Sequence, residues 1–188
     1  MPSHVALLRG INVGTRNRIA MPALRDAVSA LGHTDVSTYI QSGNLLFTPA
    51  RAVTVTLATQ LEDAVEEAFG IRPRVAVLTR DELARAIDRS PYPDESNPKY
   101  VHAVFFGDKP GAQLSAFVEM AVHTARDKGS PDDATLVGDV LYLHTPAGLG
   151  RSELAVQLGK AHGPLSTKGS GTARNWSTVT KLLALCDG

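Results

Sequence analysis

The order of apolar segments in the first 79 residues constrains the fold of this chain more than any other feature of the sequence. Short apolar runs typical of strands alternate with longer segments in which apolar residues follow helical spacing. The expected elements are a strand at 4–8, a helix at 22–31, strands at 36–41 and 44–48, a helix at 57–68 and a strand at 75–78. This β-α-β-β-α-β order is that of the split βαβ unit of ferredoxin-like domains.

The second half of the chain repeats this order. The expected elements are a strand at 100–106, a helix at 114–121, strands at 134–137 and 140–144, a helix at 152–158, a last strand within 164–172 and a terminal helix at 176–186. We therefore predict an α+β protein with two ferredoxin-like (βαββαβ) subdomains and antiparallel sheets. The expected division is a first subdomain at 1–79, a linking helix and loop at 80–99, and a second subdomain with a C-terminal helix at 100–188.

Composition narrows the class of protein. The 188 residues carry a formal net charge of zero, so bulk charge indicates no partner. Cys186 is the single cysteine, which excludes an intramolecular disulfide and is typical of a reducing compartment. We see neither a signal peptide after Met1 nor an apolar stretch long enough to span a membrane. These features predict a cytoplasmic protein without a membrane partner.

The basic residues are unevenly distributed along the chain. Residues 1–25 contain four arginines and no acidic residue, and residues 154–186 contain three lysines, one arginine and no acidic residue. The segment between them is acidic overall. Such asymmetry favours an anion site at one or both basic segments, although solvated surface charge explains it equally well.

Three clusters of residues are more specific than composition. They are Arg9-Gly10-Ile11-Asn12-Val13-Gly14, Tyr39-Ile40-Gln41-Ser42-Gly43-Asn44 and Thr172-Ala173-Arg174-Asn175-Trp176-Ser177-Thr178-Val179. With the spacing of Met21, Leu24 and Arg25, they resemble the uncharacterised bacterial domain-of-unknown-function family number 1697. The resemblance covers nearly the whole chain and implies two ferredoxin-like subdomains, but it implies no activity. One departure is Thr15-Arg16-Asn17-Arg18, where the family would have a second glycine and lysines.

The same clusters supply the candidate ligand-binding residues. A glycine-containing loop before a helix presents N–H groups to an anion, and an arginine grips phosphate through two parallel hydrogen bonds. The candidates on these grounds are Arg9, Asn12, Gly14, Ser42, Asn44, Arg174 and Asn175. We expect Arg9, Asn12, Ser42, Asn44 and Arg174 to share one surface.

Each candidate also has a structural interpretation. Gly14 and Asn12 suit a turn with positive φ, Ser42 and Asn44 suit a hairpin, and Asn175 suits a helix N-cap. Trp176 has the spacing of a core residue on the last helix. The segment 168–172 is rich in glycine and serine but lacks the spacing of a nucleotide-binding P-loop.

The sequence thus leaves the reaction and the ligand unknown. The favoured hypothesis is a binding protein for a phosphate-bearing ligand, a nucleotide or RNA, at a basic site rich in glycine and asparagine. The alternatives are a small enzyme acting on an anionic metabolite, or a structural or interaction protein without catalysis. The histidines and the lone cysteine have no zinc-binding spacing, so we expect no metal and no cofactor.

Overall fold

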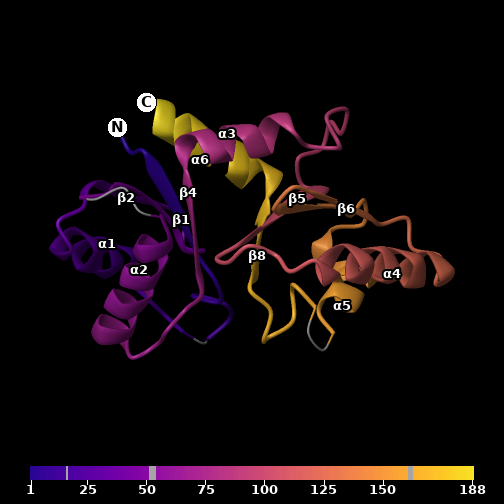
Figure 1. The fold of residues 1–188 in the computed structure, drawn as a ribbon, viewed down its shortest axis with the longest axis horizontal. Coiled ribbons are helices and arrows are strands. Elements are labelled where there is room, and N and C mark those ends of the chain that lie inside the picture. The colour runs from indigo at the N-terminus through magenta and orange to yellow at the C-terminus, as the bar shows by residue number, and fades with distance from the viewer. Residues whose placement is uncertain (16, 51–53, 161–162) are drawn as a thin grey trace. The chain divides into compact units, whose positions relative to one another are not determined.

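The computed structural model describes residues 1–15, 17–50, 54–160 and 163–188, and it folds into two compact units. The first unit consists of Met1–Arg85 together with Lys181–Gly188, and the second consists of Ala86–Thr180. Each unit contains one four-stranded sheet with helices beside it (Figure 1). The predicted α+β class with two antiparallel four-stranded sheets is confirmed.

The first unit has the β-α-β-β-α-β order expected from its apolar pattern. Its elements are β1 (His4–Leu8), α1 (Met21–Ala30), β2 (Thr34–Tyr39), β3 (Asn44–Thr48), α2 (Thr54–Phe69) and β4 (Val75–Thr79), followed by α3 (Arg80–Asp88), which continues into the second unit. The strands lie in the order β2-β3-β1-β4, and every neighbouring pair is antiparallel. This is the strand order of a ferredoxin-like sheet.

The core of the first unit lies between the sheet and the helices α1 and α2 (Figure 1). Side chains of a strand alternate between the two faces of a sheet, so Ala6 and Leu8 of β1 point to the same face. Leu24 of α1 and Leu61 of α2 pack against that face, and both are fully buried. The loop residue Ile11 joins the same cluster, so the core extends to the end of β1 and fixes the loop that follows it.

The second unit repeats the topology. Its elements are β5 (Val101–Phe106), α4 (Gln113–Asp127), β6 (Asp133–Val137), β7 (Val140–His144), the 3-10 helix η1 (Leu149–Arg151), α5 (Glu153–Leu158), β8 (Gly171–Asn175) and α6 (Trp176–Asp187), which continues into the first unit. The strand order is β6-β7-β5-β8, all antiparallel. Helices α4 and α5 pack against Val104, Leu141 and Leu143.

Two predicted strands were wrong in their positions. The last strand, expected within 164–172, is β8 at Gly171–Asn175, because backbone hydrogen bonds hold the preceding loop to itself while residues 171–175 pair with β5. The strand expected at 36–41 ends at Tyr39, because Ile40 has a φ of +50° and turns the chain out of the sheet. Local propensity favoured a strand at Ile40, and the turn overrides it.

The C-terminal helix α6 carries Trp176, which the sequence assigned to the core. Cys186 and Val179 are buried, whereas Trp176 and Leu183 are partly buried. The Trp176 ring makes an edge-on contact with the Tyr142 ring at a centroid distance of 6.2 Å. This arrangement fits the interpretation of Trp176 as a packing residue, since edge-to-face pairs stabilise buried aromatic rings.

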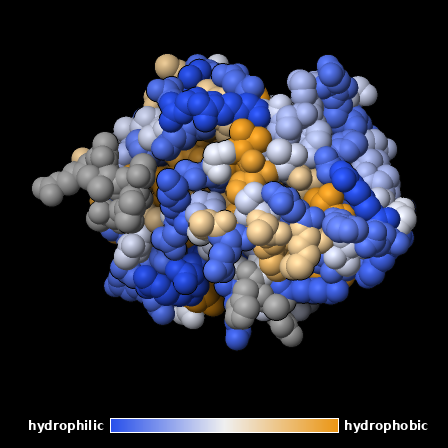
Figure 2. Space-filling model, turned by 45° about the vertical axis from the view of Figure 1, so that its right-hand side comes forward, coloured by the Kyte–Doolittle hydropathy of each residue, from blue (hydrophilic) through white to orange (hydrophobic). Residues whose placement is uncertain are grey.

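The described part of the chain contains no helix that is both long and apolar enough to cross a membrane. The face of the molecule shown in Figure 2 is mostly hydrophilic, with hydrophobic residues in small separate areas.

Candidate functional site

The first two sequence clusters meet at one end of the first sheet. The cluster that begins at Arg9 follows β1, and the cluster that ends at Asn44 forms the turn between β2 and β3. The amide of Leu8 donates to the carbonyl of Gly43 at 2.8 Å. The Nδ2 of Asn12 donates to the carbonyl of Gln41, also at 2.8 Å. Two segments about 30 residues apart in the sequence therefore lie against each other.

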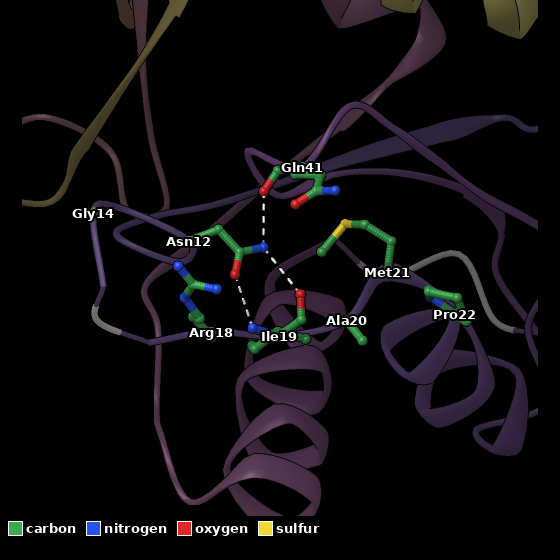
Figure 3. A pocket seen from close by; sticks show the side chains of 8 residues that line it. All are labelled: Asn12, Gly14, Arg18, Ile19, Ala20, Met21, Pro22 and Gln41. Carbon is green, nitrogen blue, oxygen red and sulfur yellow. Dashed lines mark hydrogen bonds between the residues drawn. The ribbon is translucent and has the colours of Figure 1, made fainter.

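Asn12 connects the two segments through its side chain (Figure 3). Its Nδ2 donates to the carbonyls of Ile19 and Gln41, and its Oδ1 accepts from the amide of Ile19 at 2.8 Å. Both side-chain hydrogens are therefore used, and the backbone has a φ of +53°. Asparagine tolerates this left-handed conformation better than most residues. These contacts support the turn interpretation of Asn12, which closes the loop between residues 12 and 19.

The turn between β2 and β3 requires a glycine at position 43. Gly43 has a φ of +75°, and a Cβ added there would lie 2.9 Å from side-chain atoms of Ile11 and Leu8. Asn44 is fully buried, and its Nδ2 donates to the carbonyl of Tyr39 and to the Oγ of Ser42. Ser42 and Asn44 therefore stabilise the hairpin, as the structural interpretation of the sequence expected.

A hollow of about 620 Å³ lies beside this loop, at the start of α1 (Figure 3). The described residues that line it are Asn12, Gly14, Arg18, Ile19, Ala20, Met21, Pro22 and Gln41. Asn12 and Gly14 are candidates from the sequence, and none of these eight residues is acidic. The volume falls within the range of about 300–1,000 Å³ that is usual for small-ligand sites.

The hollow combines two sources of positive potential. In Figure 3 the guanidinium of Arg18 lies beside Asn12, on the side of the hollow opposite Met21 and Pro22. Helix α1 begins at Met21, and Ala20 at its N-cap has no side-chain acceptor for the first amides. The helix dipole places a partial positive charge at this end, and free amides there can donate to an anion. This site can therefore hold a small anionic group.

The other candidates of the first unit lie outside this lining. Arg9 is partly buried at the end of β1, its amide donates to the carbonyl of Arg74, and burial lowers the pKa of its guanidinium. Ser42 is exposed in the turn, and Asn44 is buried in β3. Sequence reasoning missed Arg18 and Gln41 as lining residues. The available signals were the basic segment 15–18 just before α1 and the position of Gln41 in the second cluster.

The third cluster belongs to the second unit. Arg174 lies in β8 opposite Ala103 and is only 8% exposed. Its Nη1 donates to the Oγ1 of Thr172 and to the carbonyl of Ala173, and burial lowers the pKa of the guanidinium to about 10. Strand β8 extends through Arg174, so this residue lies within the sheet, beyond the range 164–172 in which the last strand was expected. A surface shared by Arg174 and the candidates of the first unit stays a prediction.

Asn175 and the preceding loop have structural roles. The Oδ1 of Asn175 accepts from the amide of Ser177 at 3.0 Å, so Asn175 caps α6 as its alternative interpretation expected. In the glycine- and serine-rich segment 168–172, the amides of Gly169 and Gly171 donate to the carbonyls of Ser166 and Pro164, respectively. These two amides are directed into the loop and do not present donors to a phosphate.

In the part of the chain that the structure describes, no group of three or more His, Cys, Asp or Glu side chains could hold a metal ion. The hollow is lined by apolar residues, an arginine and two amide side chains. Its polar groups include hydrogen-bond donors, which suit an anion better than a metal ion.

Comparisons with known proteins show the family and the fold. No curated protein matches the chain. The solved structure of the conserved bacterial protein SP0830 from Streptococcus pneumoniae is similar, with a TM-score of 0.73, 20% sequence identity and coverage of 98% of both chains. At this identity the similarity shows the fold alone. The family model described as "Protein of unknown function (DUF1697)" matches residues 1–142. The chain therefore belongs to the DUF1697 family.

Proposed function

We propose that this protein binds a phosphate-bearing ligand in the hollow at the start of α1. The observation that carries the proposal is the lining of this hollow, which joins Arg18 to the N-terminal end of a ten-residue helix and contains no acidic residue among its described members. A phosphate accepts hydrogen bonds on several oxygens, so it can contact a guanidinium and helix amides together.

The loop that forms the wall of the hollow is held in place before any ligand arrives. The side chain of Asn12 bonds to both Ile19 and Gln41, and Asn17 donates to the carbonyl of Gly10 at 3.0 Å. A site whose backbone is fixed in advance loses less conformational entropy on binding. Asn12 thus supports the proposal as a positioning residue, because its side chain hydrogen-bonds within the protein and fixes the loop.

The charge of the surrounding sequence also supports an anionic ligand. Residues 1–25 contain no acidic residue, and Arg25 lies on α1 itself, where its Nη1 donates to the Oγ1 of Thr38. Acidic side chains near the hollow would oppose an anion, and the first turn of α1 contains none. The local field at this end of the sheet therefore adds to the contact made by Arg18.

The test is calorimetric titration with inorganic phosphate and with ribose 5-phosphate at low ionic strength. Arg18→Gln should weaken both probes by about 10- to 150-fold, since a hydrogen bond to a charged group contributes roughly 1.5–3 kcal/mol. Arg85→Gln is the matched control, because Arg85 is an exposed arginine on α3 outside the lining. The control should bind like the unmodified protein. If Arg18→Gln and Arg85→Gln bind both probes equally, the phosphate does not bind in this hollow.

The location of binding can be measured in the same samples. Nuclear magnetic resonance spectra should show the largest phosphate-induced shifts at the amides of Met21 and Ala23, because Pro22 has no N–H group. Binding should also weaken as ionic strength rises from 50 to 200 mM, since the site is exposed to solvent and its charges are screened.

A further inference from the structure

Two exposed apolar residues are adjacent in the chain to residues that line the proposed phosphate site. Val13 is 66% exposed and lies in the chain between the lining residues Asn12 and Gly14. Ile40 is 51% exposed and directly precedes the lining residue Gln41. The 2.8 Å hydrogen bond from Asn12 to the carbonyl of Gln41 joins the two segments that carry these residues. Val13 and Ile40 are thus exposed neighbours, in the chain, of residues that line the hollow, and we refer to this pair as the apolar rim.

The backbone of Ile40 is strained. Its φ of +50° lies in the left-handed region, where a β-branched residue is a rare outlier. The other described non-glycine residues with positive φ are two asparagines and one aspartate, the residue types that tolerate this conformation. An isoleucine here gains little from burial, since half of its side chain is exposed. Strain of this kind concentrates at functional sites, which makes the exposed Ile40 side chain a candidate for a ligand contact.

From this rim we infer that the site binds a nucleoside monophosphate, whose base contacts Val13 and Ile40 while its phosphate occupies the hollow. The inference rests on the proposed function, because the phosphate contact is the one proposed for Arg18. A bare phosphate or a sugar phosphate leaves the rim unused. A nucleotide matches both parts of the site, since it joins an anion to a flat, largely apolar base.

The structure favours a single nucleotide over an RNA strand. RNA-binding sheets stack successive bases on aromatic side chains. Among the described residues, the exposed large hydrophobic side chains are six in number and none is aromatic. The hollow of about 620 Å³ also has the size of a site for one small ligand.

The experiment compares AMP with ribose 5-phosphate, which has the same phosphate and sugar but no base. AMP should bind about tenfold more tightly to the unmodified protein. Ile40→Asn should abolish this difference by weakening AMP alone, while leaving ribose 5-phosphate unchanged. The same variant should raise the melting temperature by about 2–4 °C, because asparagine adopts a positive φ with less strain. If Ile40→Asn binds AMP more weakly although it is more stable, the loss of binding cannot come from loss of structure, and Ile40 contacts the ligand.

Two further variants complete the test. Ile40→Val keeps an apolar side chain and should retain AMP binding within about twofold. Leu31→Asn is the control for loss of an exposed apolar side chain, because Leu31 is 38% exposed at the other end of α1, and it should not alter AMP binding.

The experiment distinguishes failure of the nucleotide inference from failure of the phosphate site itself. Equal affinity for AMP and ribose 5-phosphate in the unmodified protein would overturn the nucleotide inference and leave the phosphate site standing. Failure of both probes to bind would overturn the phosphate site and the inference together. Binding of a single-stranded oligoadenylate far more tightly than AMP would overturn the assignment to a mononucleotide and point to RNA.

Discussion

Replacement of Asn12 tests whether one side chain holds the wall of the proposed site. Asn12→Ala removes three hydrogen bonds, with lengths of 3.0, 2.8 and 2.8 Å. Each contributes about 0.5–1 kcal/mol net when partly exposed to solvent. Alanine also tolerates the φ of +53° less well than asparagine. The free energy of unfolding should therefore fall by about 2–4 kcal/mol.

Asn17 provides a matched control in the same loop. It also has a positive φ, of +50°, but its side chain makes one hydrogen bond, to the carbonyl of Gly10. Asn17→Ala thus carries the same backbone penalty without the two additional bonds. Its cost should be about 1–2 kcal/mol. The difference between the two variants therefore measures the net contribution of the two bonds that Asn12 makes in excess of the one made by Asn17.

The assay is urea denaturation followed by circular dichroism, combined with amide hydrogen exchange. Because the chain forms two compact units, the exchange data show which unit each variant destabilises. The amide of Ile19, which donates to Asn12, should lose protection in Asn12→Ala and keep it in Asn17→Ala. If the two variants cost the same and Ile19 stays protected, Asn12 does not hold the loop.

Three further predictions concern the stability contributed by Gly43, His33 and Arg174. Gly43→Ala should cost about 2–4 kcal/mol through positive φ and steric overlap, whereas Gly70→Ala, with a similar φ and open space, should cost about 1 kcal/mol in the same denaturation assay. Burial lowers the pKa of His33, whose Nδ1 accepts from the amide of Ala50, so the folded state binds fewer protons than the unfolded state. The free energy of unfolding should therefore fall as the pH drops below about 6.5, and His33 contributes at most about 1.4 kcal/mol per pH unit to this fall. The plot of unfolding free energy against pH should be less steep in His33→Gln, and an unchanged slope would contradict the prediction. Arg174→Ala should lower the melting temperature, because its buried guanidinium bonds within β8, and an unchanged melting temperature would favour a ligand contact instead.

The fold was predictable wherever local chemistry determines structure. The strand expected at 140–144 is observed at those residues, because its apolar pattern and the Gly138 turn are both local signals. Thr79 and Glu82 form a capping box at the start of α3: the Thr79 amide donates to the Glu82 carboxylate at 2.8 Å, and the Glu82 amide donates to the Thr79 hydroxyl at 3.1 Å. Such features depend on neighbours within a few residues, so one sequence suffices to find them.

The errors arose where distant segments decide the structure. Ile40 has strong strand propensity, yet it leaves β2, and the residues on either side of it, Tyr39 and Gln41, accept hydrogen bonds from Asn44 and Asn12. Apolar spacing carries no information about these bonds.

The candidate site was only partly foreseeable for the same reason. Asn12 and Gly14 were chosen for their loop chemistry, and both line the hollow. Arg18 and Gln41 join them only because the loop folds back on itself and against the turn after β2, which no local pattern reveals. Arg174 has the residue type of an anion ligand, but its burial in β8 could not be read from charge alone.

The division of the chain into its two units has a consequence for synthesis on the ribosome. The first unit includes residues 181–188, and Arg80 pairs with Asp187 at 2.8 Å. The ribosome therefore translates the whole second unit before it adds residues 181–188, which complete the first unit. At about 5–20 residues per second this delay is on the order of ten seconds. During that interval the first unit lacks residues 181–188, among them the buried Leu182 and Cys186, and chaperones can bind the incomplete unit.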